Sequence, residues 1–195
     1  MTLVSALNHT HKKGLFGNYE NKSEENLLKV SKIKNLLIVQ IVQYKNSKIS
    51  FENINIDSLK LKNEPLSVVS NNETRILWNG PKNWFLISTK KDLLKNITEV
   101  FKEPDFAVTD LSHSRAIIEL EGEKVKEVLK KGCPFNFNIL DKNNSINSTY
   151  NGIAFTADMI KSNPSKLRLF SLRSFGESFY HSITDASLEF GFKTI

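Results

Sequence analysis

The sequence predicts an α+β protein with mostly antiparallel sheets, because closely spaced strand-like segments are interrupted by only a few helical ones. The 195 residues include 39% hydrophobic and 25% charged residues, proportions that suit a folded domain with a substantial core. The β-branched run from Leu36 to Tyr44 predicts a buried strand. Turn residues such as Asn79-Gly-Pro81 separate further strand-like runs, which favours hairpins between neighbouring strands.

The first half of the chain contains four more predicted strands and one helix. After a turn at Asn46-Ser47, strands are expected at residues 48–54, 66–69, 74–78 and 84–88. Thr89–Asp92 resembles a helix N-cap sequence with an acid at the third helical position. The helix that follows ends before Pro104 and has its apolar residues on one side: Leu93, Leu94, Ile97 and Phe101.

The second half alternates strands with two helices. Strands are predicted at residues 108–111, 116–120, 152–160 and 166–172. A short helix after Gly122 presents Val125, Val128 and Leu129 on one face and ends at Gly132 and Pro134. A capping box, Ser174–Glu177, opens the last helix, whose apolar residues recur at helical spacing: Phe175, Phe179, Ile183, Ala186 and Phe190. The order strand, turn, strand, helix therefore occurs in residues 74–102 and again in residues 152–191.

The domain organisation that we expect is an N-terminal arm, residues 1–34, followed by a single α+β domain, residues 35–195. The arm is polar and shows no sustained period, so it is expected to be extended or partly disordered. Phe16 and Tyr19 are large apolar residues in this segment. They favour an arm that docks on a partner, although a free tail is the alternative.

Composition argues against several classes of protein. The net charge is +6, but the lysines lie among acids, whereas a nucleic-acid surface needs a one-sided basic stripe. No apolar run reaches the roughly 18 residues that a membrane-spanning helix requires. Cys133 is the single cysteine, and the N-terminus lacks the features of a signal peptide, so a reducing, cytoplasmic location is expected.

No set of residues indicates catalysis, a metal or a bound cofactor. Asp110, Ser112 and His113 are the residue types of a hydrolytic triad, but neighbours on a strand point to opposite faces. A hydrogen bond between Asp110 and Ser112 at the strand end is expected instead. Cys133 follows a helix C-terminus, which disfavours a thiolate, so it is expected to be a buried, inert thiol. Phosphate-binding loops and local metal-ligand spacings are absent, apart from His9-x-His11 in the arm.

Aromatic residues and two arginines are the remaining candidates for a structural or interface role. Trp78 and Trp84 flank the Gly-Pro turn, where they suit either the core or an interface with another subunit. Arg115 and Arg173 are candidates for buried arginines that bind carboxylates in a bidentate manner. The signature and interface candidates are therefore Phe16, Tyr19, Trp78, Trp84, Asp110, Arg115, Cys133 and Arg173.

Three segments in order resemble the gamma subunit family of heterotetrameric sarcosine oxidase: Leu77–Ile87, Val108–Phe137 and Leu167–Phe175. The middle segment carries Val-Thr-Asp-aliphatic-Ser, an arginine, a strand, a glycine and a helix that closes in Lys-Gly-Cys. More remotely, Asp110–His113 with the Gly122 helix is similar to the folate-binding aminomethyltransferases of the glycine cleavage system. The resemblance implies the folate-binding aminomethyltransferase-like fold, made of two interlocked, duplicated strand-strand-helix units.

The resemblance also implies a function. The chain is expected to be the non-catalytic accessory gamma subunit of a complex that demethylates sarcosine to glycine and passes the one-carbon unit to tetrahydrofolate. Its partners are then the alpha, beta and delta subunits, which are expected to hold FAD, FMN, NAD and tetrahydrofolate.

The main alternative is a stand-alone folate-binding or aminomethyltransferase-like protein. That function needs an acid in a hairpin after a Tyr-Thr strand. Phe155–Asp158 resembles the strand, but the acid-bearing extension is missing and Asp158 lies in the strand itself. A nucleic-acid modification factor of related fold is a third class.

Overall fold

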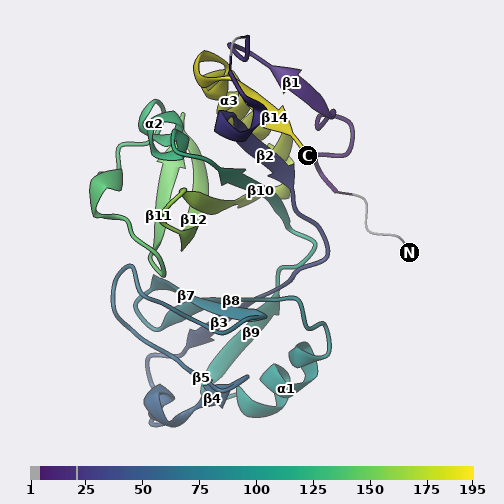
Figure 1. The fold of residues 1–195 in the computed structure, drawn as a ribbon. Helices are drawn as coiled ribbons and strands as arrows, with labels where there is room; N and C mark the ends of the chain where they lie inside the picture. Colours follow the sequence, from purple (N-terminus) through teal and green to yellow (C-terminus); the bar gives the residue numbers. More distant parts are fainter. Residues whose placement is uncertain (1–4, 21) are drawn as a thin grey trace. The chain divides into compact units, whose positions relative to one another are not determined.

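The computed structural model describes residues 5–20 and 22–195 (Figure 1). The chain forms two compact units. The first contains the residues up to Lys34 together with Ser114–Lys142 and Ile146–Ile195, and the second contains Asn35–His113 and Asn143–Ser145. This division differs from the expected arm and single domain, although one unit boundary does lie at residues 34 and 35.

The first unit is built on a seven-stranded sheet with the order β1-β14-β2-β10-β13-β12-β11. Its strands are β1 Gly14–Phe16, β2 Leu28–Lys32, β10 Arg115–Glu121, β11 Ser145–Tyr150, β12 Ile153–Lys161, β13 Lys166–Leu172 and β14 Phe192–Thr194. β14 and β2 run parallel, whereas β1 with β14, β2 with β10, β10 with β13 and β13 with β12 are antiparallel. The expectation of mostly antiparallel pairing is confirmed, with one parallel pair in a mixed sheet.

Two helices, α2 Val125–Lys130 and α3 Gly176–Ser187, complete the first unit. α3 contacts β10 and β13, and the two helices contact each other. Phe179 of α3 lies 5.4 Å from Phe155 of β12 and 6.2 Å from Tyr150 of β11, measured between ring centroids. Because aromatic rings at these distances pack edge to face or tilted, they join the helix to the sheet in one core.

Residues 5–20 and 22–34 are part of the first unit instead of a separate arm; residues 1–4 and 21 lie outside the described residues. β1 pairs with β14, and β2 lies between β14 and β10. Leu7 is completely buried. The backbone at Gly17 lies so close to the backbone at Leu188 that a Cβ on Gly17 would lie 2.3 Å from the carbonyl oxygen of Leu188. The polar residues between the few buried ones explain why the pattern indicates an arm.

The second unit contains a five-stranded antiparallel sheet with the order β6-β7-β8-β3-β9. Its strands are β3 Leu37–Gln43, β6 Val68–Ser70, β7 Thr74–Gly80, β8 Asn83–Ser88 and β9 Phe106–Asp110. A two-stranded sheet, β4 Asn55–Ile56 with β5 Leu59–Lys60, and the helix α1 Leu93–Val100 accompany it. The core gathers apolar residues from both sheets and α1, among them Ile41, Ile56, Ile76, Trp84, Leu86 and Ile97.

Most predicted elements are present, and three details differ. Residues 48–54 do not form a strand: a 3-10 helix, Phe51–Asn53, occurs there and brings the Phe51 ring to 5.1 Å from the Trp84 ring. The capping box at Ser174 is wrong, because Ser174 lies inside the 3-10 helix Arg173–Phe175 and no side chain caps α3. The sequence does not predict β1, β2, β4, β5, β11 or β14. Further 3-10 helices are Glu24–Asn26, Phe137–Ile139 and Leu188–Phe190.

The order strand, strand, helix occurs in each unit, as β7-β8-α1 in the second and β12-β13-α3 in the first. In both cases the two strands pair antiparallel. Within the described residues, no helix is both long and apolar enough to cross a membrane.

Candidate functional site

The turn between β9 and β10 carries the predicted Asp110–Ser112 hydrogen bond. Asp110 Oδ1 accepts hydrogen bonds from the backbone N–H of Ser112 at 2.9 Å and from its hydroxyl at 2.5 Å. Ser112 Oγ in turn accepts a hydrogen bond from the backbone N–H of Ile38 at 3.0 Å. Both side chains therefore tie the end of β9 to β3, which is a structural task. His113 is exposed.

Arg115 and Arg173 do not share one environment. Arg115 is half-buried, and burial lowers the pKa of its guanidinium. Its Nη1 lies 3.4 Å from the backbone oxygen of Ser114. Arg173 is exposed, so the expectation that it is a buried partner of a carboxylate is wrong. Its backbone N–H donates to the carbonyl of Ser114 at 2.9 Å.

The arginine that binds a buried carboxylate is Arg168 of β13. Its Nε and Nη2 donate to Glu119 Oε2 at 3.2 and 2.8 Å, across the pair β10–β13. The side chain of Glu119 is 9% exposed and that of Arg168 is 18% exposed. Asp158 of β12 stands opposite Arg168 in the register and is completely buried. One strand position therefore places Arg168 between two buried acids.

Lys166 extends this row of charges along β13. Its Nζ lies 2.9 Å from Glu119 Oε1 and 3.1 Å from Glu121 Oε2. Burial works against the charge of Lys166, but the hydrogen bonds to the two glutamates raise its pKa. The hydrogen bond from Lys166 lowers the pKa of Glu121. All of these groups are paired, so the row can hold strands together but offers no unoccupied carboxylate at the surface.

The tryptophans and the cysteine have packing roles. Trp84 is completely buried, and its Nε1 donates to the carbonyl of Lys62 at 2.6 Å. Trp78 is half-buried, with Nε1 3.3 Å from Asn63 Oδ1. Cys133 is 6% exposed, and its Sγ lies 3.3 Å from Ser148 Oγ.

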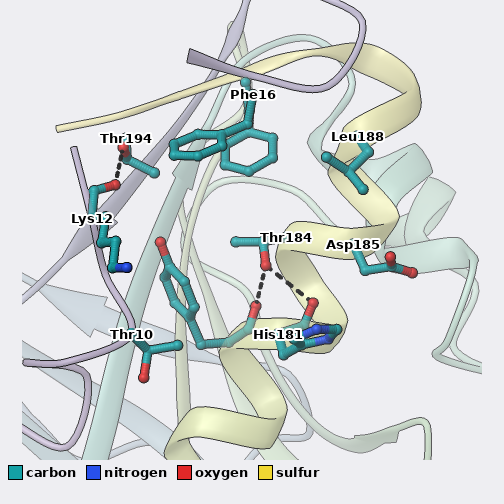
Figure 2. Close-up of a pocket in the computed structure, with 10 residues that line it drawn as sticks. Thr10, Lys12, Phe16, His181, Thr184, Asp185, Leu188 and Thr194 are labelled. Atoms are coloured by element: carbon teal, nitrogen blue, oxygen red, sulfur yellow. Dashed lines mark hydrogen bonds between the residues drawn. The ribbon is translucent and has the colours of Figure 1, made fainter. Parts of the chain in front are cut away.

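A pocket of about 260 Å³ lies between α3 and the N-terminal segment (Figure 2). One wall is the face of α3 that carries residues 181, 184 and 185, and Leu188, the first residue of the 3-10 helix after α3, continues this wall. Phe16 of β1 stacks on Phe192 of β14, with ring centroids 5.2 Å apart and planes at 21°. The lining residues are Thr10, Lys12, Phe16, Tyr180, His181, Thr184, Asp185, Leu188, Phe192 and Thr194.

Two threonine hydroxyl groups of the pocket, those of Thr184 and Thr194, are already engaged by the backbone. Thr184 Oγ1 donates to backbone oxygens of its own helix, that of Tyr180 at 2.9 Å and that of His181 at 3.1 Å. Thr194 Oγ1 donates to the backbone oxygen of Lys12 at 2.6 Å (Figure 2). The walls are therefore largely apolar, and the lining also includes the charged groups of Lys12 and Asp185 and the imidazole of His181.

His11 connects the floor of the pocket to the end of β14. Its Nδ1 lies 2.9 Å from the hydroxyl of Tyr180, and its Nε2 lies 3.1 Å from the backbone oxygen of Ile195. A carbonyl only accepts, so Nε2 carries the proton and the neutral Nδ1 accepts from Tyr180. Burial is the main cause that lowers the pKa of His11, and Lys32, Lys13 and Lys34 add to it. Burial also raises the pKa of Tyr180 to about 12.

Of the sequence candidates, only Phe16 lines this pocket; Tyr19 is exposed and is not among the lining residues. The α3 wall was missed because its side chains are mostly polar. Its helical spacing is the one signal that the sequence contains. Within residues 5–20 and 22–195, no group of three or more His, Cys, Asp or Glu residues is arranged to hold a metal ion.

The family model described as "Sarcosine oxidase, gamma subunit family" matches residues 53–189 of the chain. Sarcosine oxidase subunit gamma of Corynebacterium sp. (strain U-96) is 28% identical over 120 residues, which are 60% of this chain and 58% of that protein. The match therefore spans less than two thirds of the length of that relative.

Two solved structures show the fold. A chain of heterotetrameric sarcosine oxidase from Corynebacterium sp. U-96, in complex with pyrrole 2-carboxylate, has a TM-score of 0.80 at 20% identity, covering 96% of this chain and 95% of that one. The glycine cleavage system aminomethyltransferase T from Bartonella henselae has a TM-score of 0.65 at 12% identity, covering 100% and 60%. The predicted likeness to the aminomethyltransferase fold is confirmed.

Proposed function

The chain belongs to the sarcosine oxidase gamma subunit family, and we propose that it is the accessory gamma subunit of a heterotetrameric sarcosine oxidase. The observation that carries this proposal is the family match over residues 53–189, supported by a fold shared over 96% of the chain. The complex then demethylates sarcosine to glycine and transfers the one-carbon unit to tetrahydrofolate. Alpha, beta and delta subunits are the partners, and FAD, FMN, NAD and tetrahydrofolate bind to them.

The chain contributes binding surface to this complex, not reacting groups. The two potential nucleophiles are occupied or buried: Ser112 binds Asp110 and the backbone of Ile38, and Cys133 is buried against Ser148. Among the interface candidates, Trp84 and Cys133 belong to the core, whereas these are exposed or half-buried: Phe16, Tyr19, Trp78, Asp110, Arg115 and Arg173. A cytoplasmic location, without nucleic-acid or membrane partners, follows from the same proposal.

We also propose that the two strand-strand-helix segments, β7-β8-α1 and β12-β13-α3, arose by duplication of one ancestral unit. Their identical element order and the likeness to aminomethyltransferase T support it. That likeness also favours a second candidate function, folate binding by the chain alone. Asp158 argues against this second function, since it is completely buried in β12 and cannot contact a ligand there.

The test is reconstitution. The other sarcosine oxidase subunits from the same source are expressed with and without this chain, and sarcosine-dependent peroxide formation, flavin absorbance and complex size are measured. We expect an intact complex only when the chain is present, and no flavin absorbance from the chain alone. A stoichiometric yellow chromophore on the isolated chain, or a complex of the same size without it, contradicts the proposal.

A further inference from the structure

We propose that the pocket between α3 and residues 10–16 receives an apolar side chain from an acidic segment of a partner subunit. This inference rests on the proposed function, because the partner is one of the other subunits of the complex. It goes further in naming the surface, the anchor and the charge of the segment that docks there.

The size and lining of the pocket suit a side chain better than a cofactor. Sites for small molecules usually measure roughly 300–1,000 Å³, and this pocket has about 260 Å³. Phe16, Phe192 and Tyr180 supply three aromatic walls. Because the hydroxyls of Thr184 and Thr194 already bond to the backbone, a polar ligand finds few donors and acceptors there. Burial of an apolar anchor is the interaction that remains favourable.

An apolar side chain extends the pocket lining to the surface. Leu188, which directly follows α3 and lines the pocket, is 41% exposed. Apolar residues that line a pocket and remain open to solvent are typical of an interface centre. Leu188 and the aromatic lining therefore help to exclude water around the anchor when the partner binds.

Lysines give the surroundings of the pocket a positive charge. Lys12 is part of the lining, and Lys13 is its neighbour in the chain. Lys32 ends β2, the strand that pairs with β14 and its lining residues Phe192 and Thr194, and Lys34 follows two residues later. Among the residues that the structure describes, none of these four lysines has an ion-pair partner. Asp185 is the only acid in the lining. Complementary charge on the partner is therefore acidic, which steers association and fixes orientation.

The walls are held in place before any partner arrives. Thr194 bonds to the backbone of Lys12, and His11 bridges Tyr180 and Ile195. The backbone N–H of Asn18 donates to the carbonyl of Leu188 at 2.8 Å, beside the close crossing at Gly17. A preformed pocket loses little conformational entropy on binding, so even one anchor contributes usefully to affinity.

The experiment is a competition within the intact complex. Tagged variant and untagged wild-type chains are expressed together with the other sarcosine oxidase subunits, and the ratio in which the two enter the purified complex is measured. Thr184→Trp fills the pocket and is expected to lower incorporation about tenfold relative to wild type. Its matched control is Ile139→Trp, at a residue that is 59% exposed and lies outside the lining, and this variant should compete equally.

Two further variants separate charge from shape. Leu188→Glu adds an acid at an exposed position of the wall, so it tests the pocket even if Thr184→Trp fails to fold. Lys13→Glu/Lys34→Glu should lower incorporation most at low salt, because screening weakens exposed charges. Lys91→Glu/Lys95→Glu, with the same charge change in the second unit, is the control and should compete equally.

The outcomes distinguish the two proposals. If the wild-type chain does not enter the complex, the proposed function is wrong and the inference falls with it. If the wild type enters and folded Thr184→Trp and Leu188→Glu compete equally with it, only the pocket inference is overturned. Reduced incorporation of both pocket variants, with equal competition by both controls, supports the anchor, the charge and the partner together.

Discussion

Replacing Arg168 with methionine should destabilise the first unit strongly, because the change removes the main partner of a buried carboxylate. Arg168 donates two hydrogen bonds to Glu119, whose side chain is only 9% exposed, and stands opposite the buried Asp158. Breaking such a buried pair costs about 3–5 kcal/mol of unfolding free energy. Lys166 still contacts the other oxygen of Glu119 at 2.9 Å, so we expect the unfolding free energy to fall by about 3 kcal/mol.

Urea unfolding of four proteins measures this effect: wild type, Arg168→Met, Glu119→Leu and the double variant. Since two apolar residues can replace a buried pair with little loss, the double variant should recover a large part of the stability. Lys130→Met is the control, because its partner Glu127 is exposed, and it should change stability little. A cost for Arg168→Met no larger than that of the control, with no coupling to Glu119→Leu, refutes the reasoning.

Three further predictions concern single residues. The pKa of His11 in the folded protein is below its unfolded value of about 6.5, so its contribution to stability is complete above that pH and is lost as the pH falls toward the folded pKa. His11→Asn should therefore reduce the pH dependence of the unfolding free energy between about pH 7.5 and pH 5.5. A variant with the same pH dependence as wild type contradicts this prediction. Gly17→Ala should destabilise the folded protein more than Gly152→Ala. Both glycines have positive φ, which costs about 1–2 kcal/mol for alanine, but only a Cβ at residue 17 meets the Leu188 backbone. Equal decreases in the Tm of the two variants contradict a close approach at Gly17. Cys133→Ala should cost about 1–2 kcal/mol through lost packing and leave the activity of the reconstituted complex intact; a large loss of activity in a folded variant identifies a reactive thiol.

The elements with a strong local pattern could be predicted from the sequence. β3 and β8 are rich in apolar residues, and α1 places Leu93 and Ile97 one turn apart. Turn residues between these runs then predict which neighbouring strands pair as hairpins. These signals are local, so they do not depend on how distant segments meet.

The elements that depend on distant pairing could not be predicted. β14 pairs in parallel with β2, bringing Phe192 opposite Leu28, although more than 160 residues separate them. Each of these strands is short and half polar, so neither has a recognisable pattern alone. The same pairing turns the expected arm into part of a sheet.

Only part of the candidate site could be predicted, because the site also depends on distant segments that meet in the fold. Phe16 was identified as an anchor residue, and it does line the pocket. His181, Thr184 and Asp185 look like an ordinary solvent-exposed helix face until the N-terminal segment is placed beside them. The sequence points to Arg115 and Arg173 and does not single out Arg168, because only the register of β10 and β13 shows which arginine faces Glu119.

The most direct test of the central claim is native mass spectrometry of the complex purified through a tag on this chain, after coexpression with the other sarcosine oxidase subunits. The account predicts one copy of this chain in a four-subunit assembly, with every flavin released from the other subunits on dissociation. A tagged chain that is recovered alone, or that carries flavin or folate itself after dissociation, contradicts the claim that it is an accessory subunit.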